Sequence, residues 1–384
     1  MRLPLKYNLK SIMQRPVRSL LAVLGIGMAI SLSVIMMGLT QGLIGSTAAT
    51  GDERNVLVLS KGAESVEFSA LDPQVLHIFG TANGVSTTDG EALASPEVYI
   101  NSLVSMAGSD ATPTPVITRG VRDVGYAVHP QIRVAQGRAP RRGFEIAVGP
   151  LVATRLGLAE GQLNIGDRLH FEGASWEITG ILSAPGTAHE SEIWAPLEDL
   201  MVASKRTDYS MLVMQTEDVE SRDALLFDLR TRTDVRTTCH AEAEYYGSEA
   251  ERLKPLQAVT LMMTVMLVFG GLMAGMNTMY TSVMGRVREM AVLQVTGYRR
   301  RDVLAGFLLE GVVLSLIGGL VGCLAGLLVN GLPMKFSMSA FRFQVDGNVM
   351  AIGFMMAIAI GVVGTLVPVM RIARQRIAEG LRAT

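Results

Sequence analysis

Four long stretches with almost no charge dominate this sequence and limit the folds that it can adopt. They are residues 19–51, 255–285, 303–334 and 347–370. Only Glu310 carries a charge within them. A helix needs about 20 mostly apolar residues to cross the hydrocarbon core of a bilayer. Each stretch is long enough, so the sequence predicts an integral membrane protein with four spanning helices.

The first stretch also permits a second interpretation, a cleaved signal peptide with its small-residue cleavage site at Ser46–Ala49. The apolar part of a signal peptide has about 7–15 residues. The strongly apolar run from Leu20 to Leu43 is longer than that. We therefore favour an uncleaved membrane anchor.

Basic residues at the ends of the stretches predict the orientation. Residues 1–18 carry five Lys and Arg, residues 286–302 five and residues 371–384 four, whereas residues 331–346 carry two. Cytoplasmic flanks are enriched in Lys and Arg. With four spans, the three basic flanks fall on one side. We expect a multi-pass protein of the cytoplasmic (inner) membrane with both termini in the cytoplasm and residues 52–254 in the periplasm or the exterior.

The charge balance differs between the large outer segment and the rest of the chain. Residues 45–254 contain 18 Lys and Arg against 30 Asp and Glu, a net charge of −12, whereas the remainder has 16 against 5, a net charge of +11. The two parts are expected to face different environments. A segment with this acidic excess is a poor candidate for binding nucleic acid.

The first two apolar stretches are longer than a bilayer requires. As a helix, residues 19–51 would extend roughly 50 Å, against about 30 Å of hydrocarbon. Residues 255–285 are similarly long. We expect both helices to continue beyond the bilayer as a stalk for the outer domain; a short loop after the first span is the alternative.

The outer segment has the pattern of a mixed α/β domain. Asn55–Ser60 is a strand candidate, and a β-α-β unit runs from Ser210–Met214 through a helical pattern over Val219–Arg232 to a strand from Val235. Between them, alternating apolar residues predict short strands near residues 166–182. We interpret residues 117–206 as a β-rich subdomain inserted into the subdomain that contains Asn55–Ser60 and the β-α-β unit.

Polar residues of the outer domain offer little sign of catalysis. His129, His170 and His189 are scattered, and Glu190 and Glu192 could join His189 as ligands. We interpret them instead as a solvated surface, because carboxylates near one imidazole on a Gly-rich loop are usually solvated.

The two cysteines, Cys239 and Cys323, are expected in different compartments, so no disulfide is predicted. Cys239-His240 lacks further ligands at metal-binding spacing. We expect no metal site and no catalytic residues.

The segment 286–302 joins the second and third spans. Val287, Met290 and Val295 recur at helical spacing, and Gly297 suits a C-terminal cap. A short amphipathic helix here could rest in the lipid headgroups. It could also fit a groove on a cytosolic partner and transmit force.

This segment carries a resemblance to a known family. Arg288-Glu289-Met290-Ala291-Val292-Leu293, followed by Thr296-Gly297-Tyr298, resembles the coupling-helix motif of FtsX-like permeases, which include the MacB and LolC/LolE groups. Met290, Gln294 and Tyr298 are mild departures from it. Further parts resemble the family in chain order: residues 9–21, 137–138, 145–149, 165–167, 178–180, 194–197 and 368–382.

The resemblance implies a half-transporter permease of an ABC machine, with a MacB-type extracytoplasmic domain. The permease would form a homodimer, or a heterodimer with a paralogue, and bind two copies of a separate ATPase that holds ATP and Mg. Some relatives also use a periplasmic adaptor. The cargo would be a lipoprotein, lipid, peptide or amphiphilic drug, handled by force transmitted to the outer domain. The residues implied at the ATPase contact are Arg286, Arg288, Glu289, Met290, Ala291, Leu293, Gly297 and Arg300.

Two features of the sequence bear on this expectation directly. No G-x-x-x-x-G-K-[ST] phosphate loop occurs in the 384 residues, so ATP hydrolysis is expected in a partner and no cofactor in this chain. Small residues four apart predict close helix packing, within the chain or at a dimer seam. These are Gly318, Gly322 and Gly326 in the third span and Gly271 and Gly275 in the second.

The predicted organisation therefore has nine parts. They are a cytoplasmic segment (1–18), the first span with stalk (19–51), the outer domain (52–254), the stalk with second span (255–285), the coupling helix (286–302), the third span (303–330), a short outer loop (331–346), the fourth span (347–370) and a cytoplasmic tail (371–384). The alternative function is a membrane sensor or scaffold, like FtsX, that regulates an outer partner without transport.

Overall fold

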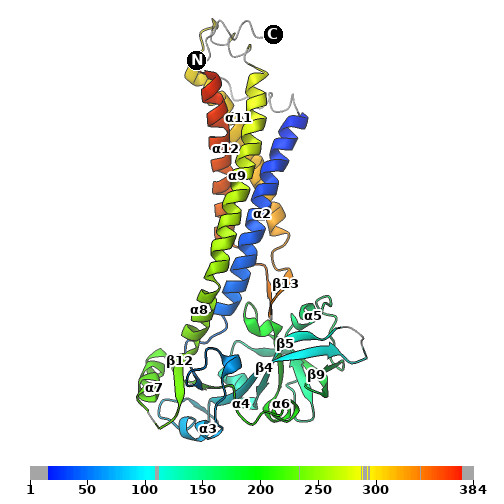
Figure 1. The fold of residues 1–384 in the computed structure, drawn as a ribbon, viewed down its shortest axis with the longest axis vertical. Coiled ribbons are helices and arrows are strands. Elements are labelled where there is room, and N and C mark those ends of the chain that lie inside the picture. The colour runs from blue at the N-terminus through cyan, green and yellow to red at the C-terminus, as the bar shows by residue number, and fades with distance from the viewer. Residues whose placement is uncertain are drawn as a thin grey trace. The chain divides into compact units, whose positions relative to one another are not determined.

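The structure is a computed structural model that describes residues 16–108, 112–232, 234–286, 288, 292, 295–337 and 339–373. These residues form two compact units. The first contains residues 16–41, 255–331 and 343–373, and the second contains residues 42–254 and 332–342. Figure 1 labels the elements of both.

Among the described residues, four helices are long and apolar enough to cross a membrane. They are α2 (Pro16–Ala48), α9 (Lys254–Met284), α11 (Arg300–Leu327) and α12 (Gly347–Ala373). The four predicted apolar helices are thus confirmed. With 33 and 31 residues, α2 and α9 are each longer than the roughly 20 residues that span a bilayer. Their place in a membrane and the stalk stay predictions.

The helices of the first unit pack along one another (Figure 1). Ile26, Ile30 and Val34 of α2 share a buried cluster with Cys323 of α11 and Ile360 of α12. Between these side chains the helices can approach closely because glycines line several of the crossings.

Within the described residues, the second unit is built on a ten-stranded sheet. The strand order is β12-β1-β11-β4-β5-β10-β7-β9-β6, and β8 pairs with β4 and β9. The strands are β1 (Asn55–Ser60), β4 (Ala94–Met106), β5 (Thr114–Val121), β6 (Arg133–Gly137), β7 (Glu145–Val148), β8 (Arg168–Phe171), β9 (Ala174–Ser183), β10 (Ile193–Pro196), β11 (Met211–Gln215) and β12 (Thr237–Ala241).

Strand β4 joins the two halves of this sheet. Its residues 94–97 pair with β11, and residues 98–104 pair with β5. The region expected as an inserted subdomain, 117–206, supplies β6 to β10 and most of β5. Its strands therefore continue the sheet that contains β1, β11 and β12.

The predicted β-α-β unit is confirmed. It consists of β11, α7 (Val219–Thr231) and β12, and both strands pair antiparallel with β1, the first strand predicted. Of Ala224, Leu225 and Leu229, which the helical spacing places on one apolar face, the two leucines are buried and Ala224 is exposed. Asp218 caps the helix by accepting a hydrogen bond of 2.8 Å from the backbone N–H of Ser221.

The predicted alternation of β8 and β9 is also confirmed. Leu169, Phe171, Trp176 and Ile178 are all buried. The rings of Phe171 and Trp176 stack with centroids 4.8 Å apart. They belong to the largest buried cluster of the unit, and Ala147 and Trp194 of the same half of the sheet belong to a second one.

The remaining elements of the second unit are short. They are η1 (Val66–Phe68), α3 (Gln74–Phe79), the hairpin β2 (Thr87–Thr88) with β3 (Glu91–Ala92), α4 (Asp123–Val128), α5 (Val152–Arg155), η2 (Ala188–Ser191), α6 (Leu197–Ser204) and α8 (Glu242–Arg252). The connection 331–346, expected as a simple loop, contains a second hairpin, β13 (Pro333–Phe336) and β14 (Ser339–Arg342).

Candidate functional site

The segment expected to contact an ATPase is described only in part. Glu289, Met290, Ala291 and Leu293 lie outside the described residues. Arg288, Gly297 and Arg300 are exposed. Gly297 has a φ of 97°, in the left-handed region that suits a helix end. The contact with an ATPase stays a prediction.

Arg286 has a different environment from its neighbours in that segment. It is buried, and its Nη1 donates a hydrogen bond of 3.1 Å to Oε2 of Glu310 on α11. Its guanidinium also lies over the ring of Phe307, 5.9 Å from the centroid. In this structure Arg286 therefore connects the end of α9 to α11 and is not presented at the surface as expected.

The glycines singled out in the sequence face other helices of the same chain. A Cβ on Gly322 would lie 2.5 Å from the carbonyl oxygen of Gly27 on α2, and one on Gly326 would lie 2.4 Å from Val34. Gly318 meets α2 in the same way. These three glycines thus pack against α2 within the chain.

Gly271 and Gly275 of α9 also pack within the chain. A Cβ on Gly271 would lie 3.0 Å from Ala29 of α2 and 3.3 Å from Ile360 of α12, and one on Gly275 would lie 3.7 Å from Ile360.

A cluster of charged side chains is buried in the second unit. Arg119 of β5 is its centre: Nη1 donates to Glu97 of β4 at 2.6 Å, while Nε and Nη2 donate to Glu192 at 2.8 and 3.0 Å. All three side chains are at most 3% exposed. Arg119 thus forms a bidentate ion pair with Glu192 and a single hydrogen bond with Glu97.

Two histidines complete this buried ionic network. Nε2 of His129 lies 2.8 Å from Oε1 of Glu97, and Nδ1 of His189 lies 3.0 Å from Oε2 of Glu192. The two imidazole rings lie 5.6 Å apart between centroids. The indole of Trp194 donates to the same Glu192 oxygen at 3.0 Å. The carboxylates of Glu97 and Glu192 thus each have at least two polar partners.

Glu242 connects the network to residues near the start and near the end of the segment 42–254. Its Oε2 accepts hydrogen bonds from the backbone N–H of Asp52 at 3.0 Å and from Nδ2 of Asn55 at 2.8 Å. Its other oxygen lies 3.8 Å from Nδ1 of His129. Because Glu242 begins α8 and Asp52 precedes β1, one buried carboxylate joins the segment after α2 to the segment before α9.

The network shifts the ionisation of its members. Burial alone would raise the pKa of the Glu97 carboxyl, but His129 and Arg119 lower it to about 2. Burial opposes Arg119 and His189 in the same way at Glu192, and the pKa of that carboxyl falls well below its ordinary value.

The two histidines shift in opposite directions. Burial lowers the pKa of His189, and Glu192 offsets this only in part. For His129, Glu97 and Glu242 outweigh burial and raise the pKa. His129 is thus the more readily protonated of the two.

The interpretation of His189, Glu190 and Glu192 as a solvated surface is wrong. All three are buried, as is His129. Sequence reasoning also passed over Arg119. The signal that could have found it is a charge at an inward position of an apolar strand, such as Arg119 within Pro115–Val121. A charge there requires an opposite charge beside it.

Among the described residues, no group of three or more His, Cys, Asp or Glu side chains could hold a metal ion. The hydrogen bonds of the network connect β4, β5, the segment before β10 and α8 through directional charge-assisted contacts.

Comparison with known proteins assigns the chain to a family. Residues 19–232 match the MacB-like periplasmic core domain, and residues 261–377 match the FtsX-like permease C-terminal domain. The macrolide export ATP-binding/permease protein MacB of Nitrobacter winogradskyi is 27% identical over 95% of this chain, which spans 58% of the length of that relative.

A second relative matches over nearly its whole length. The uncharacterized ABC transporter permease YknZ of Bacillus subtilis is 23% identical, with 98% of each chain covered. Among solved structures, the periplasmic region of MacB from Actinobacillus actinomycetemcomitans matches 53% of this chain and 94% of its own, with a TM-score of 0.40 and 8% identity. The match of both domains in chain order shows that this chain belongs to the family of FtsX-like ABC transporter permeases with a MacB-like periplasmic core domain.

Proposed function

We propose that this chain is the membrane subunit of an ABC transporter that couples ATP hydrolysis by a separate ATPase to a conformational change in its outer α/β domain. The observation that carries the proposal is the order of the two family domains along the chain. A MacB-like core domain is flanked in the sequence by apolar helices and is followed by an FtsX-like permease domain. The energy source and the working domain then lie on opposite sides of the membrane, so force must pass through helices.

Contacts within the second unit support this mechanism. A force transmitted along α2 or α9 enters the unit through residues 49–54 or through α8. Glu242 of α8 accepts hydrogen bonds from Asp52 and Asn55. Gly51 lies so close to α8 that a Cβ on it would be 2.7 Å from the backbone of Ala243. Because the two segments are bonded to one another, the sheet would receive their movement as one displacement.

The hairpin β13–β14 is a third connection into the same unit. The Arg155 guanidinium donates to the carbonyl oxygens of Ser337, at 2.6 Å, and of Pro115. Arg342 donates to Glu160 at 3.0 Å. Since the hairpin joins α11 to α12 in the chain, movement of these helices would also reach the sheet.

The proposed cargo is a lipophilic or amphiphilic molecule: a lipoprotein, lipid, peptide or drug. The relatives support export as the process, because their names include macrolide export for MacB and pyoverdine export for PvdT of Pseudomonas entomophila. We further propose a permease dimer in the inner membrane with two ATPase copies, cytoplasmic termini and, in organisms that have one, a periplasmic adaptor.

The first test is co-expression and co-purification of the tagged chain with a small ABC ATPase of the same organism, followed by measurement of the mass and ATP turnover of the complex. We expect two permeases with two ATPases. Glu289→Lys should abolish the association, whereas Glu220→Lys, an exposed acid on α7, should preserve it. A chain that purifies alone under all conditions would favour the sensor or scaffold.

A second test measures force transmission. The chain has only two tryptophans, Trp176 and Trp194, and both lie in the second unit. The permease is labelled with 5-fluorotryptophan and combined with unlabelled ATPase, so fluorine NMR reports on the α/β domain alone. We expect ATP with vanadate to shift the Trp194 signal. Unchanged fluorine signals in an ATPase-active complex would contradict force transmission.

A further inference from the structure

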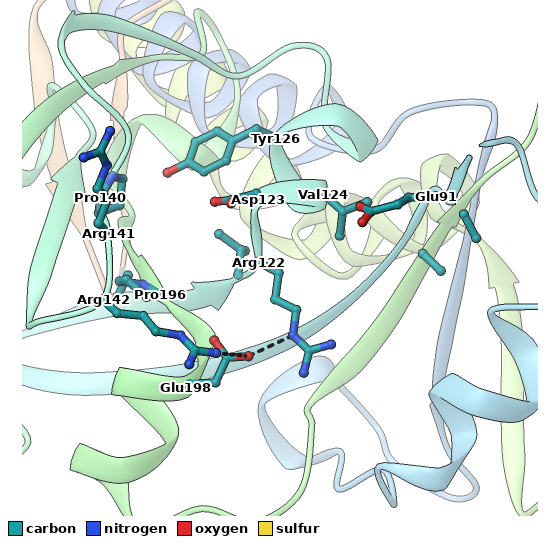
Figure 2. A pocket seen from close by; sticks show the side chains of 14 residues that line it. Glu91, Arg122, Asp123, Val124, Tyr126, Pro140, Arg141, Arg142, Pro196 and Glu198 are labelled. Carbon is teal, nitrogen blue, oxygen red and sulfur yellow. Dashed lines mark hydrogen bonds and ion pairs between the residues drawn. The ribbon is translucent and has the colours of Figure 1, made fainter. Parts of the chain in front are cut away.

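A cavity of about 810 Å³ opens in the second unit. It borders the buried ionic network, because the ring of Tyr126 in its lining lies 5.1 Å from Trp194 between centroids. Figure 2 shows its lining. The walls come from β3, the ends of β5 and β10, α4, the start of α6 and the loop 140–142. This volume is within the range of about 300–1,000 Å³ that small-molecule sites occupy.

Three arginines gather on one side of this cavity. Nε of Arg122 and Nη2 of Arg142 lie 3.0 and 3.3 Å from the same oxygen of Glu198. Both arginine side chains remain accessible, 40% and 73% exposed. One carboxylate balances only one of the two guanidiniums, and Arg141 lines the same side (Figure 2). This side therefore retains positive charge.

The loop that carries two of these arginines is fixed by hydrogen bonds. Glu145 accepts the backbone N–H of Arg141 at 2.8 Å. Asp199 of α6 accepts the backbone N–H groups of Gly143 and Phe144 at 2.7 and 3.0 Å. The backbone around Arg141 and Arg142 is thus held in place, which reduces the ordering cost of binding a ligand.

Acidic side chains line the rest of the cavity. Glu91 of β3 lies across from the arginines, beside Val124, and Asp123 lies between them (Figure 2). The lining thus contains three arginines and three acids. Glu198 lies among the arginines, so that side has two more positive than negative charges, and Glu91 and Asp123 supply two negative charges on the rest of the lining. The ring of Tyr126 and the apolar side chains of Val121 and Pro196 also line the cavity.

We infer that this cavity binds a small zwitterionic molecule of the short-peptide class, with its carboxylate toward Arg122, Arg141 and Arg142 and its ammonium toward Glu91 and Asp123. A lining with separated charges and no net charge is complementary to a ligand with the same property. Guanidinium groups pair well with carboxylates. An anion alone would leave the acidic side unmatched, and a cation alone the basic side.

The test uses the full chain in nanodiscs of uncharged lipid, without ATPase, and tetra-alanine as the probe. Binding is measured by isothermal titration calorimetry. Amidation of the peptide carboxylate, or acetylation of its amine, should each weaken binding by about tenfold, the loss of one charge-assisted hydrogen bond.

Protein variants assign each end of the peptide. Arg141→Gln with Arg142→Gln should weaken binding of the free peptide and leave the amidated peptide little affected. Glu91→Gln should weaken binding of the free peptide and leave binding of the acetylated peptide little affected. The matched controls Arg133→Gln and Glu220→Gln change exposed residues outside the lining and should leave binding unchanged.

The inference is overturned if tetra-alanine does not bind at millimolar concentration, if capping either end has no effect, or if the control variants reduce binding equally. Because no ATPase is present, each result is independent of whether the proposed coupling to ATP hydrolysis holds.

Discussion

Arg119 and Glu192 form an ion pair with two hydrogen bonds, of 2.8 and 3.0 Å, in the interior of the α/β domain. Their side chains are 0% and 3% exposed. Arg138 and Glu145 form a pair of the same two-bonded geometry on the surface, with side chains 46% and 22% exposed. The two pairs have the same chemistry in different environments, which makes them a matched comparison.

Arg119→Ala is expected to lower the free energy of unfolding by about 3–5 kcal/mol, because it leaves Glu97 and Glu192 buried without their cation. Arg138→Ala should have a much smaller effect, since water can replace the lost partner of an exposed carboxylate. Urea unfolding of the full chain in detergent, followed by tryptophan fluorescence, measures both. Equal losses would show that the buried pair has no special weight.

The stability of the domain is expected to fall as the pH drops below about 4.5. The pKa values of Glu97, lowered to about 2, and Glu192 lie below their unfolded values. A carboxyl with a lowered folded pKa contributes stability above its unfolded pKa and loses it as the pH falls toward the folded pKa. Tryptophan fluorescence in urea at pH 6, 4 and 3 measures this loss.

Glu97→Gln is the control for this pH dependence. The variant should be less stable than the wild type at pH 6, because Arg119 and His129 lose a charged partner. It should also lose less stability between pH 4.5 and 3, since one titrating carboxyl has been removed. Parallel pH curves for the two proteins would contradict the assignment to Glu97.

Two glycine substitutions in the helices are expected to differ in their effect on stability. Gly322→Ala places a methyl group 2.5 Å from the backbone oxygen of Gly27, and overpacking of this kind costs about 1–3 kcal/mol. Gly270→Ala on α9 meets no atom within 4 Å. It should be neutral or stabilising, because alanine favours a helix by up to about 1 kcal/mol over glycine.

The measurement is the fraction of monodisperse protein by size-exclusion chromatography after heating in detergent. Tryptophan fluorescence is unsuitable here because both tryptophans lie in the α/β domain. If Gly322→Ala were as heat-resistant as Gly270→Ala, α2 could not pack against α11 as described.

The apolar helices and the strands with alternating burial could be predicted from the sequence, because each depends on local periodicity. The 31 residues of α9 contain a charge only at its first position, Lys254, and β8 alternates between buried and exposed positions. Both patterns follow from the environment on each side of a single element.

The ionic network could not be predicted in the same way. Glu97, Arg119 and Glu192 are separated by 22 and 73 residues, and each in isolation has the character of a solvated side chain. Their burial is favourable only when all are present, and that depends on β4, β5 and β10 meeting in one sheet. The partners of Gly322 likewise depend on which helix lies beside α11.

Arg286 and Glu310 provide the last prediction. Their side chains are each 7% exposed and lie 3.1 Å apart. Glu310→Gln removes the negative charge that faces Arg286 and leaves a buried cation, at a cost of about 3–5 kcal/mol. We expect less monodisperse protein after heating than for the wild type. Asp302→Asn, which neutralises an acid in the first turn of the same helix, is the control and should change little.

The double variant Arg286→Gln with Glu310→Gln separates the ion pair from the packing of the two side chains. With both charges removed, neither side chain leaves an unbalanced charge, so the double variant should recover most of the stability that Glu310→Gln loses. Losses that simply add would show that the two residues act independently. They would also remove the grounds for regarding this pair as the connection between the end of α9 and α11.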